Sequence, residues 1–136
     1  MERRHPWIFS GAIERISEGI APLKEGDVVD VVTKAGDFIA RGHYQIGSIA
    51  VRVLTFEREE IDAAWWESRI ASAKSLREAL GIAHNADTTC YRLVHGEGDL
   101  LPGLVVDIYE RTAVVQCHSV GMYLSRMEIA EAIRKV

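Results

Sequence analysis

Three short apolar segments separated by glycine-containing turns constrain the fold of this chain more than any other feature. Residues 27–33, 38–44 and 49–55 are rich in Val and Ile, and their side chains alternate with the two-residue period of a strand. Glycine lies in both of the short segments between them, where it is typical of tight turns. Strands this short and this close together predict a small antiparallel barrel or sandwich, to which residues 12–17 could add a further strand.

The alternation also predicts which side chains face the core of this barrel. Arg41 and His43 lie opposite the more apolar side of their segment, and Arg52 lies opposite the valines of the next segment. We therefore expect these three side chains to point away from the core. Together with Arg3 and Arg4 they would form a basic patch, and the alternative is unconnected surface charge.

A helix is predicted from about residue 62 to residue 80. Asp62 is a favourable N-cap, and Gly81 is placed to end the helix. Ile61 and Trp66 occupy the two positions of a hydrophobic staple. The apolar residues that share one helical face are Trp66, Ile70, Ala73 and Leu80. Residues 83–89 are polar and resemble a linker.

A third zone contains further strand and helix signals. A strand is predicted over 91–94, a turn over 95–99, and a hairpin over 104–109 and 112–117, with a helix from about Met122 to the end of the chain. Three strands and one helix give a thin core with free strand edges. We therefore expect this zone to dimerise, to exchange elements with a second copy, or to be poorly ordered.

The N-terminal residues combine cations with aromatic rings. The segment RRHPWIF, residues 3–9, contains groups that can hold phosphates and rings that can stack on unpaired bases. The alternative is that Trp7 and Phe9 belong to the core and that the arginines are a solvated terminus. Spacing alone slightly favours this alternative.

Composition limits the classes of function. The 136 residues carry a formal net charge of −4, which argues against non-specific polyanion binding through many Lys and Arg but permits a local basic patch. No apolar run is long enough to span a bilayer and no signal peptide pattern is present, so a cytoplasmic location without membrane contact is expected. Cys90 and Cys117 are expected to be reduced thiols.

No group of residues has the spacing of a self-contained active site. The glycine-rich stretch 96–103 matches neither nucleotide-binding pattern, contains acidic residues and precedes no predicted helix, so a turn is the better interpretation. No pair of residues has zinc-ligand spacing. A thiol enzyme using Cys117 and His118 is a remote alternative. The carboxylates Glu97 and Asp99 are expected to be solvated or to cap turns.

Two longer stretches carry a family resemblance. Residues 3–13, RRHPWIFSGAI, resemble the opening of the PUA domain in a family of class I SAM-dependent RNA methyltransferases. The best-known members of that family methylate a cytosine at carbon 5 in large-subunit ribosomal RNA. Residues 91–107, YRLVHGEGDLLPGLVVD, resemble the start of the family's middle domain, which precedes a Rossmann-like methyltransferase domain.

The resemblance implies an α+β chain of three parts. These are a PUA-like β-barrel (pseudobarrel) over 1–60, a connecting helix over 61–82 and a partial strand–hairpin–helix middle domain over 88–136. The SAM-binding loop and the segment with the nucleophilic cysteine would be absent, so the resemblance implies an inactive N-terminal part of a larger enzyme. S-adenosylmethionine would be the cofactor of that parent, and this chain would hold no cofactor, no metal and no catalytic residue.

The resemblance also implies that the first zone binds RNA, with ribosomal RNA as the expected partner. The residues expected to contact RNA are Arg3, Arg4, His5, Arg41 and Arg52, with Trp7 and His43 as weaker candidates. The cations Arg69, Lys74 and Arg77 of the predicted helix either extend this surface or are simply solvated. The alternative function is a protein-interaction or structural β-barrel module that binds no nucleic acid.

Overall fold

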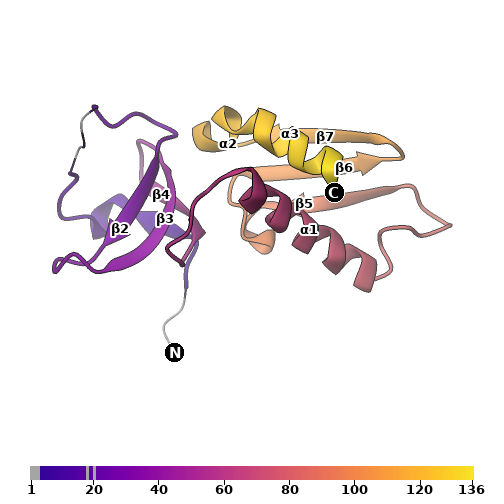
Figure 1. Cartoon of the computed structure of the whole chain (residues 1–136), viewed down its shortest axis with the longest axis horizontal. Helices are drawn as coiled ribbons and strands as arrows, with labels where there is room; N and C mark the ends of the chain where they lie inside the picture. Colours follow the sequence, from indigo (N-terminus) through magenta and orange to yellow (C-terminus); the bar gives the residue numbers. More distant parts are fainter. Residues whose placement is uncertain (1–3, 18, 20) are drawn as a thin grey trace.

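Two antiparallel sheets lie side by side in the computed structural model, which describes residues 4–17, 19 and 21–136 (Figure 1). The first sheet has the strand order β1-β4-β3-β2 and the second the order β5-β6-β7. Helices pack against the second sheet. The expected α+β fold class is therefore confirmed.

The first sheet contains the three strands predicted from the apolar segments and a fourth that was expected elsewhere. Its strands are β1 (Trp7–Phe9), β2 (Val28–Val32), β3 (Phe38–Tyr44) and β4 (Ile49–Thr55). The prediction of a strand over 12–17 is wrong, because β1 occupies the edge of β4 and is followed by a short 3₁₀ turn, η1 (Ser10–Ala12). Two further backbone hydrogen bonds, from Val53 to Pro6 and from Ser10 to Ser48, extend this pairing beyond the ends of β1.

Strand β4 is covered on both of its faces. Val53 and Leu54 are consecutive residues and both are buried. Because neighbouring residues of a strand point to opposite faces, this sheet has no fully solvent-exposed face at β4. Val53 lies on the face opposite Leu54, and Leu54 belongs to the same core cluster as Trp65 and Trp66 of the following helix.

The helix α1 (Ala63–Ala79) begins and ends as predicted. The side chain of Asp62 accepts a hydrogen bond from the Trp65 amide at 2.9 Å, and Gly81 follows the helix in the left-handed conformation, with φ of 70°. The prediction that Leu80 shares the buried face is wrong, since Leu80 is 62% exposed. It lies at the C-cap, and Arg77 is the last buried residue of the helix.

The second sheet and three helices form one core. The strands are β5 (Cys90–His95), β6 (Leu104–Tyr109) and β7 (Thr112–Cys117), and the later helices are α2 (Val120–Leu124) and α3 (Arg126–Lys135). Figure 1 shows α1 and α3 on the same face of this sheet. Helix α1 therefore does more than connect the two sheets, because its buried residues pack with those of β5, β6 and α3. The single helix expected from about Met122 is interrupted at Ser125.

The glycine-rich stretch 96–103 forms a locked turn, as predicted. It begins with the 3₁₀ turn η2 (Gly96–Asp99) and leads directly into β6. The carboxylate of Asp99 is almost fully buried, pairs with both terminal nitrogens of Arg77 and accepts a hydrogen bond from the His95 amide at 2.6 Å. Arg77 Nε also donates to the Arg92 carbonyl oxygen at 3.1 Å. This ion pair fastens the turn to α1.

Candidate nucleic-acid interface

Three of the candidate RNA-binding residues form a row across the first sheet. In the strand ladders Trp7 pairs with Arg52, and Arg52 pairs with His43. Paired residues of an antiparallel ladder place their side chains on the same face. At His43 this face is directed toward α1 and α2 of the second unit.

The prediction that His43 points away from the core is wrong. Its side chain is only 2% exposed, its ring stacks on Trp66 at a centroid distance of 6.4 Å, and it lies against the backbone of Gly121. The two-residue alternation correctly separates the two faces of β3. However, α1 and α2 cover the face with His43, which the alternation alone predicts to be exposed. His43 Nδ1 has no hydrogen-bond partner among the described residues. We therefore leave His43 out of the candidate interface.

Burial of His43 makes the stability of the chain depend on pH. Desolvation lowers the pKa of His43 from its usual 6.5 to about 4. Between these two pH values His43 is protonated in the unfolded chain and neutral in the folded chain. The free energy of unfolding therefore falls as the pH decreases from 6.5 toward 4. We expect a loss of about 3 kcal/mol over this range. Urea unfolding at neutral and acidic pH measures it, and an equal loss in His43→Leu would show that His43 is not the cause.

One of the other two residues of the row joins the two units. Trp7 Nε1 donates to Glu97 Oε1 at 3.1 Å, which links β1 to the turn η2. Arg52 is partly buried, and its Nη1 has no hydrogen-bond partner among the described residues. The Val120 amide donates to Gln45 Oε1 at 3.2 Å and adds a second link between the units.

An aromatic cluster lies on β1, an edge strand of the first sheet. His5, Trp7 and Phe9 alternate along the chain, and their ring centroids are 5.7 to 6.3 Å apart. His5 is exposed, Trp7 is half-buried and Phe9 is 48% exposed. The alternative in which Phe9 is a core residue is therefore wrong. Exposed rings on an edge strand can stack on unpaired bases.

The described members of the basic patch expected from the sequence do not assemble into a patch. Arg41 donates to both carboxylate oxygens of Asp30, at 2.6 and 3.2 Å, and to the Glu59 carbonyl oxygen at 2.5 Å. The hydrogen bond from Arg41 lowers the pKa of Asp30, so this pair is ionised on both sides. Arg4 is exposed, with its guanidinium carbon 5.5 Å from the centre of the Phe56 ring. Arg3 lies outside the described residues.

The cations of α1 do not extend the surface either. Arg69 pairs with Glu59 at 3.3 Å, Lys74 Nζ donates to the Val136 carbonyl oxygen at 2.7 Å, and Arg77 is buried against Asp99. Each of these groups is already engaged within the chain.

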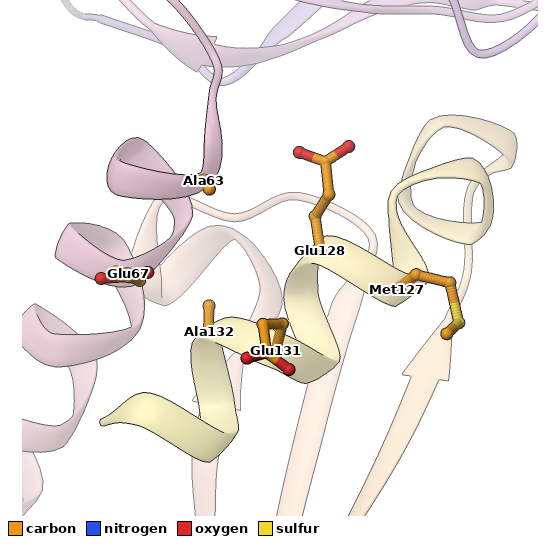
Figure 2. Close-up of a pocket in the computed structure, with 6 residues that line it drawn as sticks. All are labelled: Ala63, Glu67, Met127, Glu128, Glu131 and Ala132. Atoms are coloured by element: carbon orange, nitrogen blue, oxygen red, sulfur yellow. The ribbon is translucent and has the colours of Figure 1, made fainter.

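Two open hollows on the surface have carboxylates among their lining residues. One, of about 750 Å³, lies beside β2 and includes Asp27, Asp30 and Glu60. The other, of about 270 Å³, lies between α1 and α3, and Figure 2 shows its carboxylates on both helices. Its lining residues are Ala63, Glu67, Met127, Glu128, Glu131 and Ala132. Carboxylates repel phosphate, so neither hollow suits a nucleic-acid backbone.

Other kinds of site receive no support from the described part of the chain. No three potential ligands among its His, Cys, Asp and Glu residues gather to hold a metal ion. Burial raises the pKa of Cys117, which is the opposite of what a thiol enzyme requires. Among the described helices, none combines the length and the apolar character needed to cross a membrane.

Comparison with known proteins identifies the first sheet. Residues 1–56 match the family model described as a PUA-like domain. The PUA resemblance seen at residues 3–13 is therefore confirmed, and the cation–aromatic features of β1 belong to this domain.

The whole chain is homologous to part of a larger protein. It is 40% identical to ribosomal RNA large subunit methyltransferase I of Klebsiella pneumoniae subsp. pneumoniae, over 98% of this chain and 33% of that protein. The same protein of an Enterobacter species is 39% identical, over 97% of this chain and 33% of its own length. The chain thus spans about a third of the curated relatives it matches.

A solved structure supports the fold. A protein from Streptococcus mutans described as a SAM-dependent methyltransferase superposes with a TM-score of 0.78 at 20% identity. The match covers 96% of this chain and 33% of that one. The fold of the two units therefore recurs as part of a larger chain.

Proposed function

We propose that this chain binds RNA through its PUA-like domain and positions it for methylation of a cytosine at carbon 5 in large-subunit ribosomal RNA. The chemistry would belong to a catalytic domain of a longer parent protein. The observation that carries the proposal is the exposed aromatic edge of β1 within a PUA-like domain whose relatives are named ribosomal RNA methyltransferases.

The junction between the two units supports the positioning role. Trp7 is bonded to Glu97 across the junction, and His43 lies between Trp66 and Gly121. These contacts fix the orientation of the PUA-like domain relative to the second unit. RNA bound on β1 would therefore be held at a constant angle to whatever follows the second unit.

The glycine-rich stretch 96–103 does not fit S-adenosylmethionine, the cofactor of the proposed parent enzyme. This stretch leads into β6 and not into a helix, and its Asp99 carboxylate is bound to Arg77. We therefore assign no chemical step to this chain. Its proposed contribution is RNA binding and orientation.

Substitution of the exposed rings of β1 tests the RNA surface. We expect His5→Ala with Phe9→Ala to lower the affinity for a single-stranded RNA oligonucleotide by about tenfold, because one lost base stack costs about 1–3 kcal/mol. Fluorescence anisotropy measures the affinity. Ile46→Ala is the matched control, since Ile46 is an apolar side chain 72% exposed on the turn before β4. Equal affinities of the two variants would contradict the proposed surface.

A further inference from the structure

A second cation–aromatic cluster lies at one end of the PUA-like sheet, where β3 begins and β4 ends. Arg41 of β3 pairs with Thr55 of β4, so the residues before Arg41 lie beside the chain that follows Thr55. This register brings Phe38, at the start of β3, close to residues 56–58. None of Phe38, Phe56 and Arg58 was a candidate from the sequence.

Two arginines stack on the two rings of this cluster. The guanidinium carbon of Arg58 lies 5.0 Å from the centre of the Phe38 ring, and that of Arg4 lies 5.5 Å from the centre of the Phe56 ring. Both arginines are exposed, whereas both rings are half-buried. Among the described residues, neither arginine forms an ion pair with a carboxylate.

Arg41, which lies in the same cluster, differs from these two arginines because its guanidinium is hydrogen-bonded within the chain. Its guanidinium also approaches the Phe38 ring, at 5.9 Å, but its donors are bound to Asp30 and to the Glu59 carbonyl oxygen. Arg4 and Arg58 have no such partner in the described part of the chain. Their N–H groups and their outer faces are therefore available to a ligand.

Stacking on a ring restricts the side chain before any ligand arrives. A planar guanidinium held over an aromatic face loses less freedom on binding, which favours affinity. Its N–H donors in the plane can bind a phosphate, and its outer face can accept an unpaired base. Both contacts suit one nucleotide of a flexible single strand.

The surrounding charge argues against a duplex as the ligand. Glu57 and Glu60 lie in the same connection as Arg58, and the chain as a whole has a net charge of −4. Binding along a duplex backbone needs many unopposed cations. Two stacked arginines among carboxylates instead suit a local contact to which base stacking contributes.

We propose that the pairs Arg4–Phe56 and Arg58–Phe38 form a second RNA contact of the PUA-like domain, which takes an unpaired nucleotide of single-stranded RNA. The inference rests on the proposed RNA-binding function and adds a site to it. The two pairs lie at the end of the sheet, and the aromatic edge of β1 lies along its side. A single strand could therefore contact both.

Anisotropy titrations with a labelled single-stranded RNA and with a duplex of the same sequence test the site. We expect Arg4→Gln with Arg58→Gln to weaken single-strand binding by about tenfold and to leave duplex binding much less affected. The slope of log affinity against log salt should fall by about 1.4, because each phosphate contact of a single strand contributes about 0.7. Both arginines are exposed, so the substitutions leave the packed core in place.

Two further variants separate this site from general charge and from stacking. Lys34→Gln with Arg134→Gln removes two exposed, ion-paired cations elsewhere on the chain. This variant should change neither the affinity for single-stranded RNA nor its salt slope. Phe38→Leu with Phe56→Leu should weaken binding while the salt slope stays the same.

The outcomes distinguish the inference from the function on which it rests. If the wild-type chain binds RNA and the double arginine variant binds it with the same affinity and salt slope, the second contact is wrong and the proposed function stands. If the wild-type chain binds no RNA, or binds only an acidic peptide used as a competitor, both are wrong.

Discussion

Asp99→Ala is expected to lower the free energy of unfolding by about 3–5 kcal/mol, because it leaves a buried guanidinium without its partner. The Asp99 side chain is 4% exposed and binds Arg77 through both oxygens. The same substitution also removes the acceptor of the His95 amide. Urea unfolding followed by circular dichroism measures the loss.

Two comparisons make this expectation specific to a buried pair. Asp107→Ala breaks a similar pair with Arg92, but the Arg92 side chain is about half exposed, so a much smaller loss is expected. Arg77→Met with Asp99→Leu should recover most of the stability, because apolar groups can replace both charges. An Asp99→Ala variant as stable as Asp107→Ala would contradict the buried position of the pair.

Gly121→Ala is expected to cost about 2–3 kcal/mol through overpacking at the junction between the units. A Cβ at this position would overlap Cγ and Nδ1 of the His43 imidazole, which is held in turn by Trp66. The imidazole of His43 can move away from this Cβ only if α1 or β3 also moves. Thermal or chemical unfolding gives the stability, and the methyl resonances of neighbouring valines report whether the two units separate.

A double-mutant cycle identifies the cause of this cost. His43→Ala removes the ring, so His43→Ala with Gly121→Ala should be less destabilised than the sum of the two single variants. Gly11→Ala is the matched control, because no atom lies within 4 Å of a Cβ at that position. Additive effects of the two junction substitutions would mean that His43 does not pack against Gly121.

Local signals in the sequence predicted much of the fold. The strands β2, β3 and β4, the hairpin of β6 and β7, and both ends of α1 follow from alternation, from turn residues and from capping by Asp62 and Gly81. β1 could not be predicted in this way. It has three residues, and its pairing with β4 joins segments about 45 positions apart in the chain.

The candidate site was harder to predict because it depends on tertiary contacts. A two-residue period distinguishes the faces of β3, but it does not indicate that α1 and α2 cover the face with His43. Nor does it show that Asp30 stands opposite Arg41 and neutralises it, which requires the β2–β3 register. The contact of Arg58 with the Phe38 ring has no local sequence signal, because Phe38 lies 20 positions earlier in the chain.

The structure changes which residues would form the proposed RNA-binding surface. The sequence suggested a broad basic patch, whereas the described residues show an aromatic edge on β1 and two arginine–phenylalanine pairs. Base stacking would then contribute more than charge. The junction through Trp7 and His43 would hold this surface at a fixed angle to the second unit.

The most direct test of RNA binding by the PUA-like domain is a salt-dependent anisotropy titration of the wild-type chain and Arg4→Glu with single-stranded ribosomal RNA. The account predicts weak binding by the wild-type chain that decreases linearly with salt on a double logarithmic scale, and a marked loss in the variant. No binding by the wild-type chain at low salt would contradict RNA binding by the domain, whereas identical binding by the two proteins would contradict only the second contact, to which Arg4 belongs.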